Sequence, residues 1–316
     1  MNTTDRVAVC SRSFSRNAVL RAELLARYQH VTFNETGATL SRDALIRFLR
    51  GHEKAITALE VIDDTVLAAL PELRVVSKYG VGLDMIDLEA LRRHGKRLGW
   101  SPGVNRRAVA ELALSFTIAM LRHVPAASRE VVAGTWRQHV GRQLSGSTVG
   151  IVGCGCVGKE VVRLLQPFEC RILVNDIRRY VAFYTEHRLH EVELDVLVAE
   201  ADVVTLHVPL DDSTRGMFDV HRLSRLRPSA VLINTARGGL VDEVALKKAL
   251  QGSRLAGAAF DVFASEPPVD AELLALPNFL ATPHIGGSSE EAVLAMGRAA
   301  IANLDEDRQD GSTEGR

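Results

Sequence analysis

Short apolar runs alternate with helical patterns through the first hundred residues of the chain. The apolar runs predict strands at residues 6–10, 31–34, 55–59 and 73–77. Between the runs, apolar residues recur at helical spacing and predict helices at residues 16–27, at 64–70 and near Leu88. Strands that alternate with helices in this way are typical of a parallel α/β unit.

A glycine-rich loop, Lys78-Tyr79-Gly80-Val81-Gly82-Leu83-Asp84, follows the last of these strands. Open α/β sheets bind ligands at the carboxyl ends of their strands, and backbone N–H groups of such a loop can hold a carboxylate. The same residues also suit a tight turn into the next helix. The pattern by itself leaves both interpretations open.

The second half of the chain repeats the alternation, starting near Leu144. It predicts strands at residues 203–207, 231–234 and 256–261. Each run is apolar along its whole length, as expected for parallel strands that are buried on both faces.

The segment Ser101-Pro102-Gly103 interrupts the pattern and marks a domain boundary. A long apolar helix at residues 106–122 follows, which suits a helix that bridges two domains or contacts a partner subunit. A helix at 290–304 is expected to pack back on the first domain. The tail from Asp305, rich in charged residues, Gly and Ser, is expected to be disordered.

Composition places the chain among ordinary soluble globular proteins. Of its 316 residues, 47% are hydrophobic and 24% are charged, with a net charge of -1. This balance gives no electrostatic reason to expect a nucleic acid or an anionic membrane as a partner. The first residues contain no signal-peptide core, and no run reaches the roughly 18 apolar residues of a membrane span. We therefore expect a cytoplasmic protein.

Three glycines stand between a predicted strand and a predicted helix. Gly153, Gly155 and Gly158 have the G-x-G-x-x-G spacing of a dinucleotide-binding turn. The first allows a tight turn, the second lets a pyrophosphate approach the backbone, and the third lets the helix pack closely on the strand. The helix beginning near Val157 would then direct its free N–H groups at the pyrophosphate.

An acidic residue follows the turn about 20 residues on, where this mechanism requires it. Asp176 ends the next predicted strand, in the position of a group that binds the ribose diol. A carboxylate repels a 2'-phosphate, so the coenzyme is predicted to be NAD rather than NADP. Arg178 and Arg179 follow closely, so NADP is disfavoured rather than excluded.

Two of the four cysteines, Cys154 and Cys156, lie in the glycine turn. Their spacing and surroundings do not provide a four-ligand zinc site, and no metal is expected. We interpret both as small residues that fill the turn. The alternative is a thiol activated by the start of the helix, which would make coenzyme binding sensitive to oxidation.

Three ionisable residues lie at or just beyond predicted strand ends: Arg237, Glu266 and His284. Histidine can exchange a proton with an alcohol oxygen while hydride moves at the carbon, because its pKa lies near working pH. A carboxylate beside it fixes the ring tautomer and stabilises the imidazolium. An arginine can clamp a substrate carboxylate with two parallel hydrogen bonds. Taken singly, each residue also suits a turn or a solvated loop.

The order and placement of these motifs resemble the D-isomer-specific 2-hydroxyacid dehydrogenase family, which includes D-3-phosphoglycerate dehydrogenase, glyoxylate and hydroxypyruvate reductases and D-lactate dehydrogenase. The resemblance spans nearly the whole chain. Its motifs are Tyr79-Gly80-Val81-Gly82, Pro102-Gly103-Val104-Asn105, the Gly153 to Gly158 turn, His207-Val208-Pro209-Leu210, Thr235-Ala236-Arg237-Gly238-Gly239, Asp261-Val262-Phe263 and Pro283-His284-Ile285-Gly286-Gly287.

The resemblance implies a role for each matching residue. His284 is implied as the acid/base, Glu266 as its partner and Arg237 as the substrate clamp. The implied substrate-binding residues are Lys78, Val81, Gly82, Arg237 and His284. The implied coenzyme-binding residues are Gly153, Gly155, Cys156, Val157, Gly158, Asp176, Val208, Pro209, Thr235, Ala236, Arg237, Asp261, His284 and Gly286.

Some positions depart from the family's pattern. Cys156 stands where the family often has Arg, so one pyrophosphate contact is lost. Enzymes that act on phosphoglycerate tend to carry an Arg-Ser pair at the end of the third strand, which reads Thr57-Ala58 here, and an Arg where Lys78 stands. Two guanidinium groups that would bind a phosphate are therefore missing. The ammonium group of a lysine does not replace the two parallel hydrogen bonds that a planar guanidinium makes.

We therefore expect an α/β protein of two Rossmann-like, doubly wound parallel-sheet domains with a cleft between them. Residues 1–101 with 286–316 are predicted to bind substrate and residues 102–285 to bind NAD. The predicted activity is NAD-dependent hydride transfer between a D-2-hydroxy acid and a 2-oxo acid. The resemblance further implies a homodimer formed by the helix from Arg106 and the segment through Trp136. The alternatives are the same chemistry on a hydroxyphosphonate or other anionic substrate, and a non-catalytic NAD-sensing scaffold like the family's corepressors.

Overall fold

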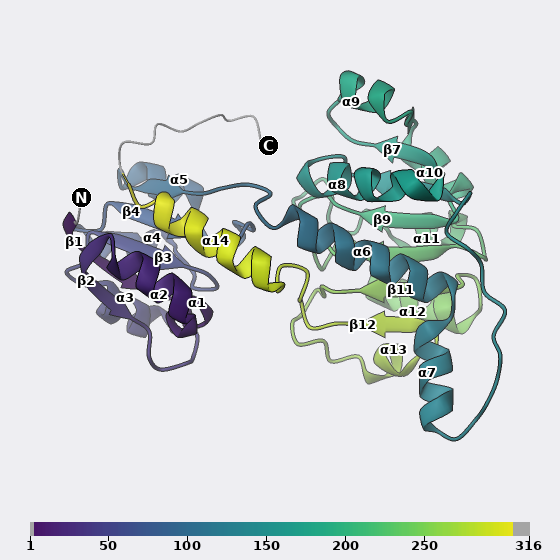
Figure 1. Ribbon diagram of the computed structural model, residues 1–316, viewed down its shortest axis with the longest axis horizontal. Coiled ribbons are helices and arrows are strands. Elements are labelled where there is room, and N and C mark those ends of the chain that lie inside the picture. The colour runs from purple at the N-terminus through teal and green to yellow at the C-terminus, as the bar shows by residue number, and fades with distance from the viewer. Residues whose placement is uncertain (1–2, 306–316) are drawn as a thin grey trace. The chain divides into compact units, whose positions relative to one another are not determined.

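The computed structural model describes residues 3–305 of the chain (Figure 1). It divides into two compact units, one holding the chain up to Asn105 together with the part from Ser288 onward, the other Arg106–Gly287. Each unit is built on one sheet, and all strand pairs in both sheets are parallel. The predicted class of two parallel α/β domains is confirmed. The divisions fall close to those predicted after residues 101 and 285.

The first unit has a five-stranded sheet in the order β2-β1-β3-β4-β5. Its strands are β1 (Thr3–Val9), β2 (Tyr28–Phe33), β3 (Lys54–Thr57), β4 (Val75–Lys78) and β5 (Arg97–Gly99). Its helices are α1 (Arg12–Arg16), α2 (Ala18–Leu25), α3 (Arg42–Leu49), α4 (Asp64–Ala68), α5 (Leu88–Arg93) and α14 (Glu290–Ala302).

Alternating residues of β1 and Cys10, which follows it, separate the two cores of this unit. Val7 and Val9 pack with α1, α2 and α14, whereas Ala8 and Cys10 pack with α3, α4 and α5. Both sets are fully buried, as expected for a central strand covered on both faces. The helix at the end of the chain therefore supplies part of the first unit's core, through residues such as Ile301.

The second unit has a seven-stranded sheet in the order β12-β11-β10-β9-β6-β7-β8. Its strands are β6 (Thr148–Val152), β7 (Arg171–Asn175), β8 (His190–Glu191), β9 (Val203–Leu206), β10 (Val231–Asn234), β11 (Gly257–Phe260) and β12 (Phe279–Ala281). Its helices are α6 (Arg106–Leu121), α7 (Val124–Val132), α8 (Cys156–Leu165), the 3-10 helix η1 (Gln166–Phe168), α9 (Val181–Glu186), α10 (Leu194–Glu200), α11 (Val220–Arg225), α12 (Glu243–Gln251) and α13 (Ala271–Ala275).

Helices cover both faces of this second sheet (Figure 1). Residues of α6 and α8 form one core with alternate strand residues such as Ile151 and Ile233, and residues of α10, α11 and α12 form the other. Because all strands run parallel, the loops that follow β6, β9, β10, β11 and β12 meet at one edge of the sheet. That edge carries the predicted site.

The structure differs from the predicted elements in three respects. The helix predicted at 16–27 begins only at Ala18 as α2, because Asn17 accepts a hydrogen bond from the Leu20 N–H and caps it. The short strands β5, β8 and β12 were not predicted, nor were helices α1, α3, α7, α9, α10, α11, α12 and α13. Asp305 is placed by Arg27, whose Nη2 lies 2.6 Å from Oδ2, so the predicted disorder is wrong for it. The rest of that tail lies outside the described residues.

Within residues 3–305 no single helix has the length and hydropathy needed to cross a bilayer. Helices α6 and α7 meet those criteria only when they are counted as one helix with a 66° bend.

Candidate active site

The turn after β6 has no room for a side chain at two of its glycines. Gly153 has a φ of +90°, and a Cβ there would lie 2.8 Å from the carbonyl oxygen of His207. A Cβ on Gly158 would lie 2.1 Å from the carbonyl oxygen of Gly153, so α8 packs directly against the turn. Both positions therefore require glycine, in the tight-turn and helix-packing roles that the spacing predicts.

The middle glycine faces open space. A Cβ on Gly155 would meet no atom within 4 Å, and Gly155 caps α8 without a side-chain hydrogen bond. The first N–H groups of a helix have no partner within the helix, and the helix dipole makes them attract an anion. The start of α8 therefore fits the pyrophosphate of a dinucleotide.

Asp176 follows β7 and directs its carboxylate back to the glycine turn. Oδ2 accepts from the Cys154 N–H at 2.5 Å, and Oδ1 accepts from the Arg178 N–H at 2.8 Å. Each oxygen keeps a lone pair for a ribose hydroxyl, whereas the negative charge repels a 2'-phosphate. This arrangement fits NAD better than NADP.

The two cysteines of the turn differ in exposure. Cys154 is fully buried, and burial together with the charge of Asp176 raises the pKa of its thiol to about 12. It fills the turn as predicted. Cys156 is exposed at the first position of α8, so the same interpretation is wrong for it, because the side chain of that first residue points away from the packed turn. Sensitivity of this thiol to oxidation stays a prediction.

His284 and Glu266 meet in the loops that follow β12 and β11. Nδ1 of His284 lies 2.8 Å from Oε2 of Glu266, and Oε1 of Glu266 accepts from the Phe263 N–H at 3.1 Å. With Nδ1 directed at the carboxylate, Nε2 is left to exchange a proton with a ligand. The two side chains are 51% and 39% exposed, respectively, so a ligand can reach them.

Asp261 fixes the segment that carries His284. Its buried carboxylate accepts from the Thr282 hydroxyl at 2.5 Å and from the N–H groups of Ile285 and Gly286, each at 2.7 Å. His284 itself has a φ of +55°, an uncommon conformation for a residue with a side chain. We infer that these hydrogen bonds hold it there. A contact between Asp261 and a nicotinamide stays a prediction.

Arg237 lies in the loop after β10, and Asn234 holds that loop. The Asn234 amide donates to the Arg237 carbonyl oxygen at 2.8 Å and accepts from the Ala236 N–H at 3.1 Å. A Cβ on Gly238 would lie 1.9 Å from the Phe263 carbonyl group. The loop of Arg237 therefore packs against the loop that leads to Glu266.

His207 and Thr235 directly follow the neighbouring strands β9 and β10 at the same register. Leu206 pairs with Asn234 in the sheet, so these two residues follow side by side. Burial lowers the pKa of His207 to about 3, which keeps the ring neutral. Its Nδ1 and the Thr235 hydroxyl are buried and have no hydrogen-bond partner among residues 3–305. Buried polar atoms of this kind mark places that a water or ligand satisfies.

His207 was not among the predicted site residues. The signal was available in the sequence, because a polar residue directly after an apolar strand run lies at the ligand-binding edge. Val208 and Pro209 follow it, and a side chain of Val208 lies next to the turn, 2.7 Å from where a Cβ on Gly153 would stand. Val208 therefore lies against the glycine turn at this edge, and its contact with the coenzyme stays a prediction.

The predicted substrate residues of the first unit lie in and before the loop after β4. Gly80 has a φ of +126°, which favours glycine. The Val81 carbonyl oxygen accepts from the Trp100 indole at 2.9 Å. Lys78 is only 7% exposed, and its ammonium donates to the carbonyl oxygen of Ala58. It is therefore not an open surface cation.

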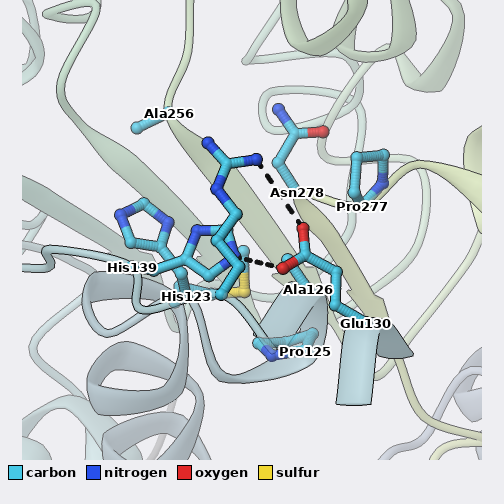
Figure 2. A pocket seen from close by; sticks show the side chains of 10 residues that line it. His123, Pro125, Ala126, Glu130, His139, Ala256, Pro277 and Asn278 are labelled. Atoms are coloured by element: carbon cyan, nitrogen blue, oxygen red, sulfur yellow. Dashed lines mark hydrogen bonds and ion pairs between the residues drawn. The ribbon is translucent and has the colours of Figure 1, made fainter. Parts of the chain in front are cut away.

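A cavity of about 220 Å³ lies at the opposite, amino-terminal edge of the second sheet, beside Ala256 and Asn278. Figure 2 shows Glu130 of α7 between two basic side chains there. Its Oε2 lies 2.7 Å from Nε2 of His139, and its Oε1 lies 3.9 Å from Nη1 of Arg137. No predicted site residue lines this cavity. In the part of the chain that the structure describes, no group of three His, Cys, Asp or Glu side chains is arranged to hold a metal ion.

Similarity to known proteins agrees with this geometry. Residues 114–286 match the family model described as D-isomer specific 2-hydroxyacid dehydrogenase, NAD binding domain. A D-3-phosphoglycerate dehydrogenase of Archaeoglobus fulgidus is 35% identical over 272 residues, covering 83% of this chain and 51% of that protein. A glyoxylate reductase of Thermofilum pendens is 36% identical over 273 residues, covering 84% of this chain and 80% of that protein. Thus the chain spans about half the length of the phosphoglycerate dehydrogenases it matches. The solved TT0316 protein of Thermus thermophilus is 33% identical, with a TM-score of 0.85 over 95% of each chain.

Proposed function

The chain belongs to the D-isomer specific 2-hydroxyacid dehydrogenase family, and on that premise we propose that it transfers hydride between NAD and a D-2-hydroxy acid/2-oxo acid pair. The observation that carries this proposal is the 2.8 Å contact between His284 and Glu266. It lies at the sheet edge that also holds the loop of Arg237 and the dinucleotide turn. Acid/base, anion-binding and coenzyme-binding groups are thus gathered on one unit.

In the direction of reduction, His284 donates a proton to the carbonyl oxygen of the 2-oxo acid. The NAD cofactor, when bound, supplies the hydride in its reduced form and accepts it in its oxidised form. Glu266 holds the ring through Nδ1, so that Nε2 faces the substrate oxygen and the imidazolium is stabilised before it gives up its proton. In the direction of oxidation, Nε2 accepts the alcohol proton.

Arg237 binds the substrate carboxylate in this proposal, with two parallel hydrogen bonds that also place the carbon to be reduced. We also propose that the backbone N–H groups of Val81 and Gly82, in the first unit, bind substrate. For the coenzyme, Asp176 binds the ribose diol and the start of α8 binds the pyrophosphate. Lys78, which the resemblance implies as a substrate residue, is buried and donates to the Ala58 carbonyl oxygen.

The test is consumption of NADH by the purified protein with glyoxylate, pyruvate, hydroxypyruvate, phosphohydroxypyruvate and a 2-oxo phosphonate, with NADPH run in parallel. We expect at least one 2-oxo carboxylic acid to be reduced, and faster with NADH than with NADPH. Turnover of the phosphonate alone would favour the same chemistry on an unusual anion. Binding of NADH without turnover of any acid would contradict the enzymatic proposal and favour a scaffold.

We also propose a homodimer formed through α7 and the segment that follows it. Large apolar side chains there are exposed to solvent: Val132 is 87%, Trp136 85% and Val140 94% exposed. Large apolar side chains that are exposed to this degree are a feature of protein–protein contacts. We expect sedimentation equilibrium to give twice the mass of one chain for the wild-type protein. The variant Val132→Asp/Trp136→Ser should give the mass of one chain. A wild-type protein with the mass of one chain would overturn the proposal.

A further inference from the structure

The loop that carries Glu266 has few attachments to the rest of the second unit. Residues 262–268 form no helix or strand, and residues 264–267 are exposed. Val262 and Phe263 are buried at the start of the loop. Among residues 3–305, and apart from the contact between Glu266 and His284, a single hydrogen bond joins this loop to another element. The position of Glu266 therefore depends on the packing of Phe263 and on that one hydrogen bond.

Glu243 makes this hydrogen bond. Its Oε1 accepts from the Ala264 N–H at 2.8 Å. The preceding N–H, that of Phe263, donates to Oε1 of Glu266 at 3.1 Å. Two successive N–H groups of the loop are thus bound by two carboxylates, one from α12 and one from Glu266 itself. Because the two N–H groups belong to adjacent residues, a displacement of Ala264 also displaces the peptide that binds Glu266.

Helix α12 gives Glu243 a fixed base. Glu243 is the first residue of the helix, and the preceding Asp242 caps it by accepting from two N–H groups of the first turn. Leu246 and Leu250 anchor the helix in the core of the second unit. The Ala264 peptide also packs against the loop of Arg237, since a Cβ on Gly238 would lie 2.5 Å from the Ala264 nitrogen. The hydrogen bond therefore ties the Glu266 loop to a rigid part of the unit.

The carboxylate of Glu243 is half-buried. Burial, together with the charges of Asp270 and Asp242, raises its pKa. A carboxyl group whose pKa is higher in the folded than in the unfolded chain lowers stability once it is ionised. The nearby Lys247 binds Asp270 at 2.8 Å and Glu272 at 3.0 Å instead. Stability gives no reason for a carboxylate at this position, whereas the placement of a catalytic loop does.

We propose that Glu243 is a positioning residue for the catalytic pair: by binding the Ala264 N–H, it keeps Glu266 directed at Nδ1 of His284. This inference rests on the proposed function. Glu243 acts through the loop and not by contact with the reacting atoms. Its effect should fall on the proton-transfer step, which needs the ring in one orientation, and not on the binding of NADH.

The first test compares two substitutions at this position. Glu243→Ala removes the acceptor and should lower kcat for the best 2-oxo acid about tenfold, as expected for the loss of a hydrogen bond to a charged group. KM for the acid and Kd for NADH should stay within about twofold, since neither binding group is moved. Glu243→Gln keeps an oxygen that can accept from the Ala264 N–H and should retain kcat within about threefold. Equal losses of kcat in the two variants would contradict the role of the hydrogen bond.

A double-mutant cycle separates positioning from a merely structural role. In a Glu266→Ala background, adding Glu243→Ala should lower kcat by less than about twofold, because no carboxylate is left to position. Single-turnover reduction of the acid measures both rates. A structural role would lower kcat by the same factor with and without Glu266, and that additive result would overturn the inference.

Glu272→Ala is the matched control. Glu272 also lies in the first turn of its helix, α13, and its only printed contact partner on α12 is replaced here by its ion pair with Lys247. Because its side chain is 74% exposed and contacts no part of residues 262–268, the variant should keep kcat within about twofold. Hydrogen exchange followed by mass spectrometry should show faster exchange over residues 262–268 in Glu243→Ala and not in Glu272→Ala.

The outcomes distinguish this inference from the proposed function. An active wild-type protein with an additive cycle, or with unchanged exchange in Glu243→Ala, would overturn the inference and leave the proposed chemistry intact. A wild-type protein that reduces no 2-oxo acid would overturn the proposed function, and the catalytic role of Glu243 with it.

Discussion

Replacing His284 with alanine is expected to lower kcat for NADH-dependent reduction by about 10³-fold, within the range that a positioned acid/base contributes. The ring is the only titratable group that we place at the substrate oxygen, and its Nδ1 is already directed at Glu266, 2.8 Å away. Removing it leaves the carbonyl oxygen to take its proton from water. Single-turnover reduction followed by NADH absorbance measures the loss directly.

The chain offers a matched control for this variant. His139 and Glu130 form a second histidine–carboxylate pair, 2.7 Å apart, at the opposite edge of the same sheet (Figure 2). His139→Ala removes the same atoms from a contact of the same kind and should leave kcat within about twofold, because this half-buried pair lies at the edge of the sheet opposite the proposed site. NADH affinity, measured by fluorescence titration, should be similar in both variants. A His284→Ala enzyme with near-normal kcat would remove the role that we give to the ring.

The edge of the sheet where the site lies could be predicted because it follows from the strands themselves. The run at residues 231–234 coincides with β10, since three consecutive buried apolar residues between turn signals admit few other structures. Parallel strands place their carboxyl ends together. Arg237, Glu266 and His284 could thus be assigned to one edge although up to 47 positions separate them in the sequence.

Details that depend on packing between distant segments could not be predicted from the sequence pattern. The strand β12 has only three residues, Phe279–Ala281, too few for a periodic signal. Helix α3 buries only Leu45 and Leu49, and two buried positions are too few to show a helical period in the sequence. Glu60 reads as a solvated acid between Leu59 and Val61, and its burial follows only from the fold of the loop over β3 and β4.

Arg237→Lys is expected to lower kcat/KM for the preferred 2-oxo acid by about 100-fold, because a charge-assisted bidentate contact is replaced by one point-charge contact. The backbone should stay in place, since Asn234 holds the Arg237 carbonyl oxygen at 2.8 Å whatever the side chain is. NADH affinity should change little if the guanidinium acts on the substrate carboxylate. Steady-state kinetics with the acid and fluorescence titration with NADH separate the two.

Another arginine that makes two hydrogen bonds to one carboxylate serves as the control for replacing a guanidinium with an ammonium group. Arg298 binds Glu23 through Nε at 3.0 Å and Nη2 at 2.8 Å on the surface of the first unit. Arg298→Lys makes the same chemical change there and should leave kcat/KM unaltered. If Arg237→Lys instead weakened NADH binding as much as it lowered kcat/KM, the guanidinium would act on the coenzyme, and its role as the carboxylate clamp would have to be withdrawn.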